Sequence, residues 1–269
     1  YSAYSILKTG SDEWGQFLPL NPRGFGDFKP PLYTYLTIPS IALFGLSIEA
    51  VRIPAALVGV LTVAVVFFLT FELFKNYLVA YWSMFLTSIS PWYIQASRTA
   101  WEAGPGVLFF SLGLLFYLKA KSNNFYLVWA SICWGLTLYS YHSFRVFVIL
   151  FTAGLIFLSW NQIKKMKYKY TALAVLIIFI IPLILSLSSI MARSKDVSIT
   201  SPKTLSSYFE NKGESVLPSG VDKFFDNKFL FIGDRFFNNY LSYFSPGFLF
   251  TGSRPDNTYL NFPYFPLTY

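Results

Sequence analysis

The chain has 269 residues, of which 54% are apolar, 21% are aromatic and only 13% are charged. This composition excludes an ordinary soluble domain and indicates a polytopic membrane protein. The single cysteine, Cys133, cannot form an intramolecular disulfide, and one cysteine with one histidine cannot build a Cys/His zinc site, so a metal could be held only by carboxylates. We predict neither a metal nor another cofactor.

The first elements of the chain are too short to span a bilayer. Residues 1–9 have the pattern of the end of an amphipathic helix that closes at Thr9-Gly10, and no initiator Met precedes them. We therefore expect the sequence to be a fragment of a longer protein. A loop rich in Gly and Pro then leads to an apolar helix over residues 30–44, which falls short of the roughly 20 residues of a span. We predict that both helices are juxtamembrane.

Six longer apolar segments follow and complete the predicted transmembrane core, residues 1–191. They are residues 51–74, 77–94, 103–118, 125–141, 144–160 and 170–191. Pro54 and Pro105 suit the first turn of a helix, whereas Pro182 is expected to bend the last one. The predicted fold class is an all-α polytopic membrane bundle. Residues 192–269 are predicted to form a truncated extracytoplasmic loop segment.

Lysines gather in three of the short connections between these spans. They are Lys75, then Lys119 and Lys121, then Lys164, Lys165, Lys167 and Lys169. All three connections fall on one side, which the positive-inside rule makes cytoplasmic. The net charge of +8 therefore orients the chain among membrane lipids and does not indicate nucleic-acid binding. We predict a multi-pass protein of the cytoplasmic (plasma) membrane with an active face on the extracytoplasmic side.

Lys29 follows Asp27 by two residues and directly precedes Pro30 and Pro31, which open the short apolar helix. A proline in the first helical turn loses no hydrogen bond, so the backbone beside Lys29 is held rigidly next to a helix N-terminus. A lysine at that position is suited to bind a phosphate group. The alternative is a surface turn whose lysine only extends toward water.

Two more polar clusters fall on the same predicted side. Arg98 and Glu102 are four residues apart and form a simple ion pair if the segment is helical. Trp101 suits either the membrane interface or stacking on a sugar. His142 and Arg145 lie in a tight turn between two spans, where they are either ordinary interfacial residues or ligands of a phosphate.

The order and spacing of several runs resemble the GT-C membrane glycosyltransferases, most closely the branch of protein O-mannosyltransferases and the aminoarabinose transferase of lipid A. The runs are Lys29-Pro30-Pro31-Leu32-Tyr33, Leu43-Phe44-Gly45, Ala50-Val51-Arg52-Ile53-Pro54-Ala55-Ala56-Leu57, and Arg98 ahead of an acidic residue. The resemblance covers about residues 1–145 and continues beyond them only in topology. It implies a GT-C-like bundle in which the helix after the Lys-Pro-Pro run is juxtamembrane.

The resemblance also implies an activity. Members transfer a sugar from a polyprenyl-phosphate carrier to an acceptor outside the cytoplasmic membrane, with inversion at the anomeric carbon. The acceptor is a protein, a lipid or a glycan. The candidates for donor-phosphate binding are Lys29, Arg98, His142 and Arg145. The candidate catalytic carboxylates are Glu102 and Asp27.

The family's principal carboxylate lies in an Asp-Glu pair that precedes the amphipathic helix. Asp12 and Glu13 follow that helix here and have the pattern of a solvated loop pair, so we expect the general base upstream of Tyr1. A transporter or flippase of an anionic lipid or glycolipid is the alternative function, although such proteins carry ionisable residues near the middle of the membrane. A non-catalytic membrane scaffold is a further alternative.

Overall fold

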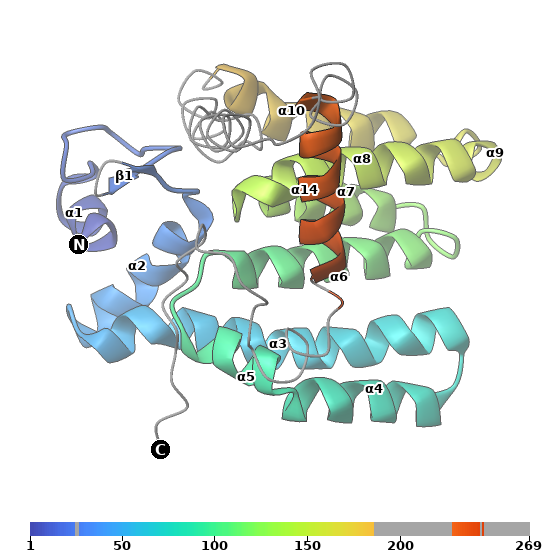
Figure 1. The fold of residues 1–269 in the computed structure, drawn as a ribbon, viewed down its shortest axis with the longest axis horizontal. Coiled ribbons are helices and arrows are strands. Elements are labelled where there is room, and N and C mark those ends of the chain that lie inside the picture. Colours follow the sequence, from blue (N-terminus) through green and yellow to red (C-terminus); the bar gives the residue numbers. More distant parts are fainter. Residues whose placement is uncertain (25–26, 186–227, 243, 245–269) are drawn as a thin grey trace, which may run out of the picture. The chain divides into compact units, whose positions relative to one another are not determined.

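The computed structural model describes residues 1–24, 27–185, 228–242 and 244, and the chain divides into two units, Tyr1–Ile190 and Met191–Tyr269. The first unit is a helical bundle with one small β-hairpin (Figure 1). In the second unit, α14 (Lys228–Ser242) exposes the aromatic side chains of Phe236, Phe237 and Tyr240. The end of the predicted span 170–191 and most of the predicted loop segment 192–269 lie outside the described residues.

The described elements of the first unit are almost all helical, which confirms the predicted fold class. In chain order they are α1 (Ser2–Thr9), β1 (Arg23–Gly24), β2 (Asp27–Phe28), α2 (Leu32–Phe44), α3 (Ile48–Phe74), α4 (Tyr77–Ile89), α5 (Pro91–Arg98), α6 (Ala103–Lys119), α7 (Tyr126–Leu138), α8 (His142–Leu158), α9 (Trp160–Ile163) and α10 (Lys169–Leu185). The two short strands pair antiparallel, with Arg23 opposite Phe28 and Gly24 opposite Asp27.

Local sequence sets several of the helix ends. α1 ends at Gly10, whose φ of 71° is a left-handed conformation that glycine adopts without strain. The side chain of Ser47 accepts a hydrogen bond from the N–H of Ala50 at 3.1 Å and caps α3. Asn76 caps α4 in the same way, because its side-chain oxygen accepts from the N–H of Leu78 at 2.8 Å.

Some helix bounds differ from those expected. α2 begins at Leu32, after both prolines of the Lys-Pro-Pro run. The cap at Ser47 starts α3 earlier than expected, so Pro54 lies inside the helix and not in its first turn. The predicted helix 77–94 is interrupted at Ser90, because a residue before a proline is pushed toward extended backbone.

A single helix containing both Arg98 and Glu102, which would place them on one face, is also absent. α5 ends at Arg98, Glu102 directly precedes α6, and the two helices meet at a bend of 116°. The two side chains therefore do not share a helical face. In the described part of the chain, the ion pair between them that a continuous helix would allow is not formed.

The buried core of the bundle lies mainly between α6, α7, α8 and α10. Its residues include Tyr117, Leu127, Ala130, Trp134, Leu138, Val148, Ala172 and Leu183. Two glycines allow helices to approach closely, since a Cβ atom at Gly113 would overlap the indole ring of Trp134 and one at Gly135 would overlap the ring of Phe179. Small residues at helix contacts are typical of bundles in membranes, where packing rather than the hydrophobic effect holds helices together.

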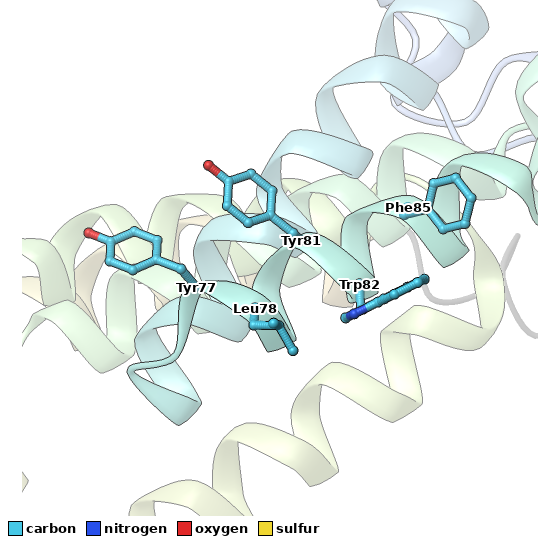
Figure 2. A pocket seen from close by; sticks show the side chains of 5 residues that line it. All are labelled: Tyr77, Leu78, Tyr81, Trp82 and Phe85. Carbon is cyan, nitrogen blue, oxygen red and sulfur yellow. The ribbon is translucent and has the colours of Figure 1, made fainter.

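Large apolar side chains cover the outer faces of the bundle. Examples that are more than half exposed are Val60, Phe74, Leu150, Phe157 and Ile178. On α4, one exposed apolar groove of about 570 Å³ is lined by Tyr77, Leu78, Tyr81, Trp82 and Phe85 (Figure 2). No charged side chain lines this groove, so it lacks the groups that sugar transfer requires. Surfaces of this kind are unusual in water and are normal against lipid.

Among the described helices, only α3, with 27 residues, is by itself long and apolar enough to cross a membrane. The bent pair α5 and α6 meets the same criterion when the two helices are taken together. α2, α4, α7, α8 and α10 are apolar but shorter. The predicted six-span topology therefore stays a prediction.

Candidate active site

The ammonium nitrogen Nζ of Lys29 lies 3.9 Å from the carboxylate oxygen Oε1 of Glu102. The Lys29 side chain is 44% exposed and that of Glu102 is 22% exposed, so a ligand can reach the pair from outside. Lys29 precedes α2 and Glu102 precedes α6. The structure thus brings together two of the residues that the sequence placed on one membrane surface.

Backbone hydrogen bonds hold the segment that carries Lys29 on both sides. The N–H of Lys29 donates to the carbonyl oxygen of Pro22 at 2.9 Å and closes the turn that contains β1 and β2. Three residues later, the N–H of Leu32 donates to the carbonyl oxygen of Tyr139 at 3.1 Å, which ties the start of α2 to the end of α7. Lys29 is therefore anchored to the bundle through its main chain.

Glu102 is positioned by the bend between α5 and α6. The hydroxyl group of Ser140, which is fully buried, donates to the backbone carbonyl oxygen of Glu102 at 2.5 Å. Glu102 also stands at the N-terminus of α6, where the partial positive charge of the helix end stabilises a carboxylate. The connection between α7 and α8 therefore contacts the segments of both charged residues.

Arg145 and His142 form a hydrogen-bonded chain behind Lys29. Arg145 is only 7% exposed. Its Nε donates a hydrogen bond to the carbonyl oxygen of Leu138 at 3.3 Å, and its Nη2 donates one to the side-chain oxygen of Asn21 at 3.4 Å. Its Nη1 lies 3.1 Å from Nδ1 of His142, and Nε2 of His142 lies 3.2 Å from the carbonyl oxygen of Phe28. Phe28 directly precedes Lys29.

Of the other two predicted site residues, Arg98 does not join this chain of contacts, and for Asp27 only the backbone is described. Arg98 is exposed at the end of α5 and forms no ion pair in the described part of the protein. The backbone of Asp27 belongs to β2, whereas its side chain lies outside the described part of the structure. The roles of Arg98 and Asp27 stay predictions.

Tyr33 links α2 to α3 beside the site through a hydrogen bond. The phenolic hydroxyl of Tyr33 donates to the backbone carbonyl of Val51 at 2.8 Å, and the residue is 6% exposed. Burial disfavours the charged phenolate and raises the pKa of Tyr33 to about 12. The helix that follows Lys29 therefore has a fixed position against α3.

Asp12 differs from the solvated carboxylate that its loop position suggested. It is 4% exposed, and its Oδ1 accepts the N–H groups of Trp14 at 3.0 Å and Gln16 at 2.9 Å. An aspartate that bonds nearby backbone amides shapes a turn. Asp12 therefore has a structural position in the loop that leads to Lys29.

An apolar groove of about 510 Å³ opens beside Trp101, the residue before Glu102. Its lining residues are Leu86, Thr87, Ser90, Trp92, Tyr93 and Trp101. The ring of Trp101 also packs edge-on against Tyr141, with the ring centres 6.4 Å apart. An aromatic surface therefore includes the residue that directly precedes Glu102.

Sequence reasoning did not identify Ser140, Asn21 or the carbonyl group of Phe28 as parts of the site. A serine near the end of an apolar segment and an asparagine in a Pro-containing loop have no pattern that separates them from surface residues. A backbone carbonyl has no sequence signal at all, because every residue carries one.

The structure is a bundle of apolar helices in which Lys29, before α2, pairs with Glu102, before α6. This arrangement agrees with a membrane glycosyltransferase of the GT-C type. Residues 28–185, more than half of the chain, match the family described as dolichyl-phosphate-mannose-protein mannosyltransferase. The chain belongs to this family, so it is a membrane glycosyltransferase whose family uses a dolichyl-phosphate sugar. Searches of curated proteins and of solved structures found no match.

Proposed function

We propose that this protein transfers a sugar from a polyprenyl-phosphate carrier to an acceptor on the extracytoplasmic side of the cytoplasmic membrane. The observation that carries the proposal is the pair of Lys29 and Glu102, because a leaving phosphate needs a cation and an acceptor hydroxyl needs a base. The family description names mannose on dolichyl phosphate as donor and protein as acceptor. Lipid and glycan acceptors are the alternatives.

The proposed reaction is a single displacement. An acceptor oxygen forms a bond to the anomeric carbon while the bond from that carbon to the phosphate oxygen breaks, which inverts the configuration. The electron pair of the broken bond goes to the carrier phosphate, where the ammonium group of Lys29 stabilises the added negative charge. The proton of the acceptor goes to a carboxylate, and within this chain Glu102 and Asp27 are the candidates for that role.

The other basic residues support the donor headgroup in this proposal. Arg98 is exposed near the end of α5 and is proposed as a second cation for the phosphate. The buried guanidinium of Arg145 adds positive potential near Lys29, and His142 links Arg145 to the carbonyl of Phe28, the residue before Lys29. A low-dielectric membrane surface strengthens each of these interactions.

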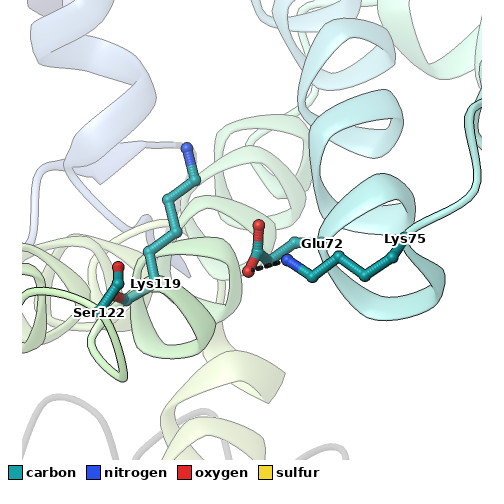
Figure 3. A network of polar contacts seen from close by, with 4 residues as sticks. All are labelled: Glu72, Lys75, Lys119 and Ser122. Carbon is teal, nitrogen blue, oxygen red and sulfur yellow. Dashed lines mark hydrogen bonds and ion pairs between the residues drawn. The ribbon is translucent and has the colours of Figure 1, made fainter.

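The proposed orientation follows from the two ends of the bundle. α3 and α6 both start on the side where α2 lies and run in the same direction (Figure 1). They end near Lys75 and Lys119, and Lys75 forms an ion pair with Glu72 at 2.5 Å (Figure 3). Because lysine-rich connections are cytoplasmic, the end that carries Lys29 and Glu102 is extracytoplasmic. We propose this orientation together with the six predicted spans.

The ion pair of Glu72 and Lys75 offers a matched control for the test, because it lies at the other end of α3. Membranes that contain Lys29→Gln or Lys75→Gln protein are incubated with radiolabelled dolichyl-phosphate mannose, and the label transferred to protein is counted. We expect Lys29→Gln to lower transfer by roughly 100-fold, as loss of a charge that stabilises the transition state does. Lys75→Gln leaves transfer unchanged, and both proteins reach wild-type levels in the membrane.

Normal transfer by Lys29→Gln would remove Lys29 from the mechanism. Movement of labelled dolichyl-phosphate mannose between the leaflets of proteoliposomes, with no transfer of mannose, would instead support the transporter alternative. A protein that does neither would correspond to the scaffold alternative.

A further inference from the structure

We propose that His142 is a positioning residue for Lys29, and that it acts as the neutral imidazole with its hydrogen on Nε2. The inference rests on the proposed function, in which Lys29 binds the carrier phosphate. It assigns His142 a role through the main chain at Phe28, in place of direct contact with the donor. His142 is half-buried and is the first residue of α8.

The hydrogen-bond partners of His142 determine its tautomer. A guanidinium group can only donate, so Nδ1 of His142, which lies 3.1 Å from Nη1 of Arg145, must accept. A carbonyl oxygen can only accept, so Nε2, which lies 3.2 Å from the oxygen of Phe28, must donate. Only the neutral imidazole with its hydrogen on Nε2 satisfies both partners. A protonated ring would direct an N–H at the guanidinium group.

The chain of contacts begins at a fixed point in the bundle. Arg145 is held in place by hydrogen bonds to the carbonyl of Leu138 and to the side chain of Asn21. Through His142 this anchor extends to the carbonyl of Phe28, and the next N–H along the chain, that of Lys29, is bound to Pro22. The main chain that carries Lys29 is thus held on both sides of the residue.

The described charged group in direct contact with His142 is positive. Arg145, from α8 itself, places a positive charge against Nδ1, and the N-terminus of α8 adds a partial positive charge. Lys29, in the segment that His142 contacts, is also positive, whereas Glu102 at the start of α6 is negative and is paired with Lys29. The neighbouring ring of Tyr141, with its centre 6.3 Å away, is neutral near physiological pH. Acidification that protonates the ring breaks the contact with Arg145.

The first test is spectroscopic and does not require activity. The chain contains one histidine, so a protein with 15N-labelled histidine and a tag without histidine gives one set of ring-nitrogen signals, assigned by their loss in His142→Gln. Near neutral pH we expect a protonated Nε2 and an unprotonated Nδ1. The opposite tautomer, or a doubly protonated ring, would overturn the proposal.

The second test compares three substitutions by their steady-state constants for dolichyl-phosphate mannose. The side-chain amide of Gln reaches near Nε2 and can donate to Phe28, whereas Asn offers an oxygen near Nδ1 and Ala offers neither. We expect His142→Ala and His142→Asn to raise KM for the donor roughly tenfold, as loss of one useful hydrogen bond does, while His142→Gln stays close to wild type. The wild-type KM rises as the ring protonates, and that of His142→Gln does not. An equal KM for all three variants would contradict the positioning role.

The third test asks whether His142 acts through Lys29. Binding of radiolabelled dolichyl phosphate is measured for His142→Ala in the wild-type background and in the Lys29→Gln background. A positioning residue weakens binding in the first background and adds no loss in the second. Equal losses in both backgrounds would show direct contact and overturn the proposal. If the wild-type protein transfers no mannose, the proposed function fails, while the ring spectrum and the binding test still decide the role of His142.

Discussion

Ser140 donates its hydroxyl hydrogen to the backbone carbonyl of Glu102 across 2.5 Å, and this contact joins the end of α7 to the start of α6. The serine is fully buried. Because the bond holds the residue that carries the candidate carboxylate, it sets the position of that carboxylate relative to Lys29. The two residues belong to connections that are far apart in the sequence and adjacent in the bundle.

We expect Ser140→Ala to lower mannose transfer and to reduce the free energy of unfolding by about 1 kcal/mol, because a buried carbonyl loses its hydroxyl partner. Ser143→Ala is the matched control, since Ser143 is exposed in the next turn. Thermal unfolding in detergent and label transfer measure the two effects. Equal transfer by the Ser140→Ala and Ser143→Ala proteins would contradict the assigned role of the hydroxyl.

Gly106 provides a prediction about packing near the same turn. A Cβ atom at Gly106 would overlap the ring of Phe144 and would lie 2.9 Å from Oγ of Ser140. We expect Gly106→Ala to destabilise the protein by about 1–3 kcal/mol and to lower transfer, because α6 must move away from α8. Gly154→Ala is the control, since nothing lies within 4 Å of a Cβ at Gly154. A melting temperature equal to that of the control would disprove the predicted close packing.

The raised pKa of Tyr33 leads to a prediction for the free energy of unfolding at alkaline pH. Burial raises the pKa of Tyr33 to about 12, so above pH 10 the unfolded chain releases the phenolic proton while the folded chain retains it. The free energy of unfolding therefore decreases as pH rises from about 10 toward about 12, and it is unaffected by this group at lower pH. Thermal unfolding of the wild type and Tyr33→Phe between about pH 8 and about pH 11 measures the effect. We expect a shallower alkaline decline for Tyr33→Phe, and parallel curves would refute the assignment.

Family, fold class and several helix ends followed from the sequence. The runs around Lys29 and Pro54 carried the resemblance, and the match over residues 28–185 confirms the family. Gly10 illustrates why some helix ends are predictable, since a left-handed turn depends on residues within one turn of the helix. The cap at Ser47 is equally local but was missed, so α3 starts earlier than expected. The break at Ser90 was missed because the apolar run continues through it, although Pro91 carried the local signal.

The predicted site residues separated into two groups in space. Lys29 and Glu102 meet directly, and His142 and Arg145 meet the main chain beside Lys29. Arg98 shares no such contact among the described residues, because the bend after α5 turns it away from the helix of Glu102. Residue type indicated which side chains can carry charge at a membrane surface, but it did not indicate which of them touch.

The amino-acid sequence by itself determined that the chain is an all-α membrane protein of this glycosyltransferase family, because composition, caps and short motifs act over a few neighbouring residues. Only the tertiary structure decided that Lys29 faces Glu102, that Arg145 is buried against Asn21, and that His142 binds the carbonyl of Phe28. These contacts join segments far apart in the chain, and their geometry depends on how closely α6, α7 and α8 pack. That packing follows from the shapes of all the side chains between the helices, which no local pattern records.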